Sequence, residues 1–251
     1  MKALPALLIL LSFCPPALAA QDECVVLLHG LGRTAHSMSK LERRLEQSGY
    51  IVRNEGYPSR DRKIEDLAEV VGRGIAHCRE QHASKIHFVT HSLGGILVRQ
   101  YFQDHEALPS TRVVMLGPPN HGSEITDLHK DAWWYRKVTG PAGQQLGTGP
   151  DSVPNRLGPV RLEIGVIAGT GAHDLFFSSD FKTENDGKVS VESAKLKEMK
   201  DFIVVDNGHT FIMSSDGVIR QVMFFLREGR FDHNGEAPAL SASRPTGSAG
   251  R

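Results

Sequence analysis

One short stretch, Lys85 to Gly95, constrains the fold of this 251-residue chain more than any other. Residues 86–89 form an apolar run that is typical of a strand buried in a parallel sheet. The chain then passes through two glycines into a helical apolar pattern at residues 96–102. A strand therefore runs directly into a helix, with Ser92 at the corner. So sharp a turn imposes strained backbone angles on Ser92 and raises its oxygen above the sheet, facing the helix N-terminus.

Strand and helix patterns alternate along most of the remaining chain. Further apolar strands are expected at residues 24–28, 50–52, 112–116, 164–169 and 202–205. Amphipathic helices are expected at residues 38–45, 61–81 and 218–226. In the first of these helices, Ser39 and Glu42 are spaced as a capping box. This alternation predicts an α/β fold, a mostly parallel sheet with helices on both faces, in which catalytic loops gather at the carboxyl ends of the strands.

Both ends of the chain have patterns that do not belong to a folded domain. Lys2 provides a positive start, residues 4–13 are apolar but too few to span a bilayer, and Ala17-Leu18-Ala19 is a small-x-small cleavage site. We therefore interpret residues 1–19 as a signal peptide and expect a secreted or periplasmic mature chain without an integral membrane segment. The domain is expected to cover residues 20–231, followed by a disordered tail at residues 232–251.

The charge balance argues against a polyanionic partner. The chain has 29 basic and 29 acidic residues and thus offers no basic field for nucleic acid or an anionic membrane. A small or apolar substrate fits this charge balance better than a polyanion does. The mature chain, at about 230 residues, is long enough for one substantial core, so a single domain is expected.

Two cysteines, Cys24 and Cys78, remain after removal of the signal peptide. Cys24 opens a strand, while Cys78 continues the apolar stripe of the expected helix at residues 61–81. Both therefore fall at the end of the sheet that lies away from Ser92. An oxidising compartment favours a disulfide between them, and two buried free thiols are the alternative.

The segment around Ser92 resembles the nucleophile elbow of α/β-hydrolases of the lipase and esterase kind. The family pattern is Gly-x-Ser-x-Gly, and this chain has Thr90 where the first glycine belongs. The resemblance extends in motif order over nearly the whole mature chain, from Val25 to Phe231. It implies the α/β-hydrolase fold and a nucleophilic role for Ser92.

A second motif, His29-Gly30-Leu31-Gly32, is similar to the oxyanion loop of lipases. In that family, backbone N–H groups after the His-Gly pair and after the nucleophile hold the reacting oxygen. The resemblance therefore makes Leu31 and Leu93 the expected oxyanion donors. The glycines also suggest a phosphate loop, but the third glycine and a Lys-Ser/Thr pair are missing, so a nucleotide site is the weaker interpretation.

A serine hydroxyl needs an imidazole to take its proton and a carboxylate to orient that imidazole. The resemblance supplies both in the family's order of Ser, acid and His. Asn-Asp-Gly-Lys-Val resembles the acid loop and indicates Asp186, with Asp174 and Glu184 as alternative acids. Asn-Gly-His-Thr-Phe resembles the histidine loop and indicates His209. His121 precedes the acid and is assigned to a turn.

Residues 124–159 interrupt the regular pattern. In lipase relatives the insertion at this point forms a lid or a wall of the substrate pocket. Its aromatic cluster, Trp133, Trp134 and Tyr135, is the candidate substrate-binding group. The alternative is an ordinary helix that buries the two tryptophans.

Together these features predict a serine ester hydrolase, either a carboxylesterase or a lipase, that acts on a small-molecule or lipid ester through an acyl-enzyme. An acyltransferase or amidase would use the same residues, and a binding protein with a hydrolase fold but no turnover is a further alternative. We expect no cofactor and no metal, because the histidines are scattered and Cys-x-x-Cys is absent.

Overall fold

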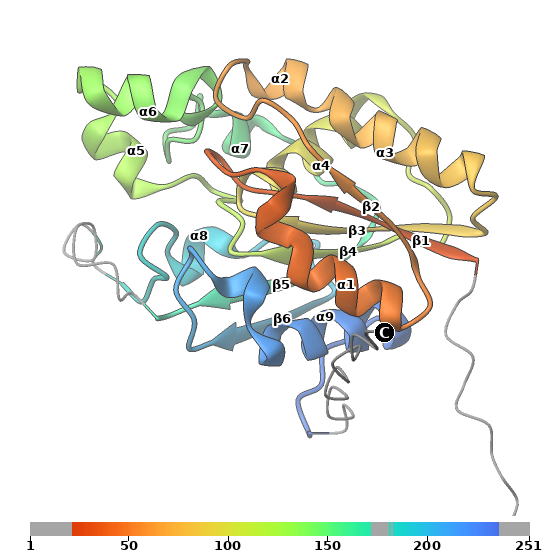
Figure 1. Cartoon of the computed structure of the whole chain (residues 1–251). Helices are drawn as coiled ribbons and strands as arrows, with labels where there is room; N and C mark the ends of the chain where they lie inside the picture. Colours follow the sequence, from red (N-terminus) through yellow and green to blue (C-terminus); the bar gives the residue numbers. More distant parts are fainter. Residues whose placement is uncertain (1–21, 172–180, 182, 236–251) are drawn as a thin grey trace, which may run out of the picture.

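The computed structural model describes residues 22–171, 181 and 183–235 (Figure 1). The expected signal peptide, Asp174 and most of the expected tail lie outside these residues. Six parallel strands form one sheet in the order β2-β1-β3-β4-β5-β6. The strands are β1 Glu23–Leu28, β2 Ile51–Glu55, β3 Lys85–His91, β4 Arg112–Leu116, β5 Glu163–Gly169 and β6 Asp201–Val205. All six predicted strands are confirmed, and so is the parallel α/β arrangement.

Helices cover both faces of this sheet. In Figure 1, α2 and α3 lie on one side of the sheet and α1 and α9 on the other. The helical segments before the insertion are η1 Ala35–Met38, α1 Ser39–Gln47, α2 Ile64–Leu67, α3 Glu69–Glu80 and α4 Leu93–Asp104. Within the insertion lie α5 Glu124–His129, α6 Trp133–Gln144 and α7 Val153–Arg156. After it come α8 Val191–Ala194, η3 Ile212–Ser214 and α9 Asp216–Glu228. Within the described ranges, no helix has both the length and the apolar content needed to cross a bilayer.

Strand β1 shows why both faces must be covered. Successive side chains of a strand point to opposite faces. Val26 and Leu28 accordingly join the core cluster of α3 and α4, whereas Val25 and Leu27 join the cluster of α1 and α9. All four side chains are fully buried. Burying each side chain of this size stabilises the fold by roughly 1.5–3 kcal/mol, so both helical layers are needed.

Strand β5 approaches α9 so closely that one of its positions requires glycine. A Cβ atom at Gly165 would lie 2.5 Å from a ring carbon of Phe225. Phe225 itself is fully buried. The aromatic ring thus occupies the space that a side chain on this face of β5 would take.

Two details of the helices differ from the prediction. The expected helix at residues 61–81 begins at Ile64 and is divided into α2 and α3 at Ala68. The expected capping box is wrong. Ser39 has helical backbone angles because η1 leads directly into α1, whereas an N-cap residue needs extended ones. The Glu42 carboxylate instead accepts a hydrogen bond from the Asn54 side chain at 2.7 Å.

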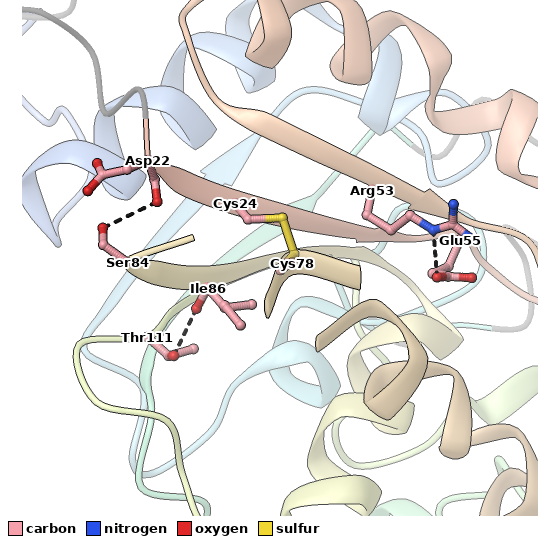
Figure 2. The surroundings of a disulfide bond; sticks show 8 residues. All are labelled: Asp22, Cys24, Arg53, Glu55, Cys78, Ser84, Ile86 and Thr111. Carbon is pink, nitrogen blue, oxygen red and sulfur yellow. Dashed lines mark hydrogen bonds and ion pairs between the residues drawn. A yellow bond between two sulfur atoms is a disulfide. The ribbon is translucent and has the colours of Figure 1, made fainter. Parts of the chain in front are cut away.

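The predicted disulfide between Cys24 and Cys78 is confirmed (Figure 2). It joins the start of β1 to the end of α3, and the two Cα atoms are 5.7 Å apart. Both side chains are fully buried. Beside it, the Ser84 hydroxyl donates a hydrogen bond to the backbone oxygen of Asp22. This end of the sheet is therefore closed by a covalent bond and by backbone contacts.

The chain after α9 returns to the sheet. The side chain of Gln221 exchanges hydrogen bonds with the backbone of Asp232, at 2.8 and 2.9 Å. His233, which the sequence placed in the tail, contacts the Asp201 carboxylate through Nε2 at 3.0 Å. Residues 232 and 233 are thus attached to α9 and β6.

Replacing both cysteines, as Cys24→Ala with Cys78→Ala, is expected to lower the free energy of unfolding by about 4 kcal/mol, because the unfolded chain loses a cross-link over 54 residues. Urea unfolding of the variant and of the wild type, with and without reductant, measures this change. Reduced wild type should resemble the variant. Equal unfolding midpoints for the oxidised and reduced wild type would contradict the expectation.

Candidate active site

Ser92 occupies the corner between β3 and α4 with φ 51° and ψ −120°, a conformation that residues other than glycine rarely adopt. Its N–H donates to the carbonyl of Leu116 at the end of β4, at 2.9 Å. The following turn is tight, since a Cβ atom at Gly94 would lie 2.7 Å from the Leu28 carbonyl oxygen. The sharp, strained corner predicted from the sequence is therefore present.

Thr90, the departure from the family pattern, fits without displacing the helix. Its side chain is fully buried, and its hydroxyl has no hydrogen-bond partner among the described residues. A Cβ atom at Gly95 would lie 3.3 Å from that hydroxyl. The small residue at position 95 thus leaves room for threonine at position 90.

Asp186 and His209 form a buried hydrogen-bonded pair. His209 Nδ1 lies 2.7 Å from Asp186 Oδ2, and the backbone N–H of His209 donates to the carbonyl of Asp186 at 2.8 Å. The other carboxylate oxygen, Oδ1, accepts backbone N–H groups from Lys188 and Val189 at 3.0 and 2.8 Å. Both oxygens of the Asp186 carboxylate therefore accept hydrogen bonds, and His209 is held through its ring and through its backbone N–H.

One pocket of about 330 Å³ brings most of the predicted residues together. Ser92, His209 and Leu31 all line it, and Trp134 and Tyr135 of α6 contribute to its wall. Further apolar lining comes from Ile125, Val138, Leu146 and Val189. Leu93 is buried as the first residue of α4, where an N–H group has no partner within the helix.

The loop that contains Leu31 is held by two residues from the chain after β2. The Tyr57 hydroxyl donates to the carbonyl of His29, and the two rings stack with centroids 4.1 Å apart. The N–H of Gly32 donates to the Ser59 hydroxyl at 3.0 Å. Tyr57 and Ser59 could not be predicted from the sequence, because no local pattern marks contacts that join positions 27 and 28 residues apart.

His91 contacts the backbone of His209, a role that no local sequence pattern indicates. Its Nε2 donates to the His209 carbonyl at 3.0 Å, and the two ring centroids are 4.8 Å apart. Burial lowers the pKa of His91 well below its usual value, and electrostatic repulsion between the His91 and His209 rings adds to this effect. The ring is therefore neutral. Its Nδ1 has no partner among the described residues and faces Gly30, where a Cβ atom would lie 2.7 Å away.

The aromatic cluster divides into two parts. Tyr135 is buried and shares a hydrogen bond of 2.8 Å with the Thr126 hydroxyl. Trp134 is 39% exposed and lines the pocket, whereas Trp133 is 76% exposed and lies outside the lining. The part of Trp133 in substrate binding therefore stays a prediction. The alternative prediction, a helix that buries both tryptophans, is wrong, because both side chains are exposed.

The rival residues lie elsewhere. Glu184 is exposed, two positions before the carboxylate that contacts His209. His121 Nδ1 is bonded to Asn155 Oδ1 at 2.9 Å in an exposed turn, outside the pocket lining. In the part of the chain that the structure describes, no group of three or more His, Cys, Asp or Glu side chains is placed to hold a metal ion.

The fold and this pocket together define a hydrolase built on a parallel α/β sheet. Comparison with family models agrees, because residues 25–217 match the model of the alpha/beta hydrolase family. The chain therefore belongs to the α/β hydrolase family. The comparison with curated proteins gave no match.

Solved structures of lipases and esterases have a similar fold. The mature lipase BlEst2 of Bacillus licheniformis is 21% identical with a TM-score of 0.65, over 84% of this chain and 94% of that one. The metagenomic carboxyl esterase MGS0156 is 16% identical with a TM-score of 0.61, over 78% and 67%. Phospholipase PlaB of Legionella pneumophila is 19% identical with a TM-score of 0.56, over 69% of this chain and 45% of that one.

Gly117→Ala is expected to separate Asp186 from His209. A Cβ atom at this position would lie 2.8 Å from Asp186 Oδ2 and 3.1 Å from His209 Nδ1, and the backbone has φ +53°. We expect a loss of about 1–3 kcal/mol in the free energy of unfolding. The downfield proton resonance of the His209–Asp186 hydrogen bond should also disappear. Gly56→Ala is the matched control, since nothing lies within 4 Å of its added Cβ atom. An unchanged resonance in Gly117→Ala would refute the geometry.

Three buried histidines, His29, His87 and His91, are expected to make the fold sensitive to mild acid. Burial is the largest cause that lowers the pKa of each of them in the folded protein. In the unfolded chain imidazole titrates near its usual value of about 6.5. Below that pH the unfolded state therefore binds more protons, so the free energy of unfolding falls as the pH is lowered, by up to about 1.4 kcal/mol per pH unit per group. Urea unfolding at pH 7.5, 6.5 and 5.5 measures the slope, and a flat profile would contradict it.

Proposed function

We propose that this protein is a serine ester hydrolase, a carboxylesterase or a lipase, with Ser92, His209 and Asp186 as its catalytic residues. The observation that carries the proposal is the buried His209–Asp186 pair, whose imidazole lines the same pocket as the strained corner serine. An imidazole oriented by a carboxylate is what a serine hydroxyl needs to become a nucleophile. The order of these residues in the chain also matches that of the family.

The reaction would proceed by two acyl transfers. Ser92 attacks the ester carbonyl while His209 takes the proton of the hydroxyl, and Asp186 stabilises the imidazolium that forms. The N–H groups of Leu31 and Leu93 hold the oxyanion of the tetrahedral intermediate. His209 then protonates the leaving alcohol, and water repeats the sequence on the acyl-enzyme.

Two contacts support the positions of these groups. Tyr57 fixes the backbone of the loop that carries Leu31, and His91 fixes the carbonyl of His209. Preorganised donors of this kind need not reorient as charge develops, which is the main source of electrostatic catalysis. We assign Tyr57 and His91 as positioning residues.

The insertion at residues 124–159 would form a wall of the substrate pocket. It contributes Trp134 and Tyr135 together with apolar side chains, which fits the acyl part of a small-molecule or lipid ester. Lipases and a carboxyl esterase are among the proteins of similar fold, and this agrees with an ester substrate. We also propose that the protein acts outside the cytoplasm, since a buried disulfide suits an oxidising compartment.

A fluorophosphonate probe is expected to label the wild type but not Ser92→Ala, because only an activated serine reacts with it. With nitrophenyl esters from acetate to palmitate, Ser92→Ala should lose at least about 10³-fold in kcat/KM. Ser84→Ala, at the opposite end of the sheet, serves as the control and should retain labelling and turnover. Equal labelling of Ser92→Ala and wild type would exclude Ser92 as the nucleophile. Acceptor alcohols or amines in the assay separate hydrolysis from acyl transfer.

A further inference from the structure

The charged residues in the described lining of the pocket all have one sign. Arg33, Arg60 and Lys188 belong to the lining, and none of the described carboxylates does. The chain as a whole is balanced, with 29 basic and 29 acidic residues. The described lining is therefore cationic, whereas the chain as a whole is balanced.

These three charges are not neutralised by ion pairs with described residues. Arg33 is half-buried, and its guanidinium donates to the carbonyl of Thr210 at 3.1 Å. Arg60 and Lys188 are exposed at the pocket. The carboxylate of Asp186 is outside the lining, and its oxygens are bound by His209 and by two backbone N–H groups. An anionic group in the pocket would therefore contact cationic side chains whose N–H donors are not paired with a described carboxylate.

Two of the cations are grouped near His209. Thr210, which Arg33 contacts, directly follows His209. Lys188 lies two residues after Asp186, and its backbone N–H holds that carboxylate. Both positive charges also contribute to lowering the pKa of His91, whose ring contacts His209. Positive charge is therefore present beside the proposed general acid.

The two halves of an ester differ in where they must lie. The leaving alcohol takes its proton from His209, so it lies beside that imidazole. Much of the apolar lining comes instead from the insertion, with Ile125, Val138 and Leu146. The acyl half therefore faces the insertion, and the alcohol half faces Arg33 and Lys188.

We propose that the substrate is an ester whose alcohol half carries a negative group, such as a carboxylate or a phosphate, bound by Arg33 and Lys188. Arg60 adds positive charge at the pocket. This inference rests on the proposed function, because it uses His209 as the group that protonates the alcohol. Arginine and lysine are the side chains best suited to bind carboxylate and phosphate oxygens.

The test compares esters that differ in charge at one position. Wild-type enzyme is assayed at low salt with 4-carboxyphenyl butyrate and with the methyl ester of its carboxyl group. We expect kcat/KM to be at least about ten-fold higher for the anionic ester, in line with a charge-assisted hydrogen bond. The preference should shrink as sodium chloride is added, since salt screens exposed charges. Equal rates, or a preference for the neutral ester, would overturn the proposal.

Variants assign the preference to particular side chains. The double variant Arg33→Gln with Lys188→Gln should reduce the ratio of anionic to neutral kcat/KM to about one-tenth of the wild-type ratio or less. Arg73→Gln, an exposed arginine on α3, is the matched control and should keep the wild-type ratio. Because the ratio is taken within each enzyme, a general loss of activity does not affect it. An unchanged ratio in the double variant would overturn the assignment.

Further substrates locate and identify the anion. A phosphonate in place of the carboxylate on the same phenyl butyrate shows which anion is preferred. Mono-4-nitrophenyl succinate, compared with 4-nitrophenyl butyrate, places the charge in the acyl half and should show no gain. A higher kcat/KM for the succinate than for the butyrate, with no such increase for the charged phenyl ester, would place the anion in the acyl half and overturn the proposal.

Failure of the proposed function gives a different result. In that case no ester is hydrolysed and Ser92 is not labelled. The cationic pocket is then tested by calorimetry with 4-hydroxybenzoate and its methyl ester. Tighter binding of the acid that is lost in the double variant supports the anion site, and equal or absent binding overturns it.

Discussion

The strained backbone of Ser92 is the constraint on which the rest of the site depends. A residue at φ 51° and ψ −120° costs about 1–3 kcal/mol and persists only when its surroundings hold it there. Here β3 and α4 supply that support, because both are buried on either side of the corner and the Ser92 N–H is bonded to β4. The close approach of Gly94 to the Leu28 carbonyl draws β1 into the same arrangement. The position of the serine is thus a property of the whole central sheet.

The parallel sheet then explains why distant segments meet. Every strand ends at the same edge, so the loops after β1, β3, β5 and β6 converge there. Convergence alone does not orient side chains, and a second set of contacts does so. His91 holds the carbonyl of His209, Asp186 holds its ring and its N–H, and Tyr57 holds the loop after β1. Each of these bonds joins segments at the carboxyl ends of two different strands, so these segments position one another.

The difference between strand placement and side-chain orientation also explains how much the sequence could predict. The strands were predictable because buried parallel strands have continuous apolar runs. The contact between Asp186 and His209 was predictable from motifs in a known order. Tyr57 and His91 were not, because their roles arise from hydrogen bonds across 28 and 118 residues. The capping box failed because η1 precedes α1, and the exposure of Trp133 depends on how α6 lies over the pocket. Local patterns predict elements and candidate groups, whereas tertiary contacts decide how those groups are held.

The insertion is attached to the domain unevenly along its length. Arg99 of α4 is buried, and its guanidinium donates to the carbonyls of Asn120 at 2.8 Å, Pro154 at 3.1 Å and Leu157 at 3.3 Å. Burial lowers the pKa of Arg99 to about 10, so it remains charged and keeps all these donors at neutral pH. The part of the insertion near α7 is therefore tied to the helix that begins at the elbow. In contrast, α6 exposes large apolar side chains at Trp133 and Val138, 76% and 56% exposed. Amino-acid changes in the pocket wall are accordingly expected to destabilise the fold less at the exposed positions of α6 than at α7.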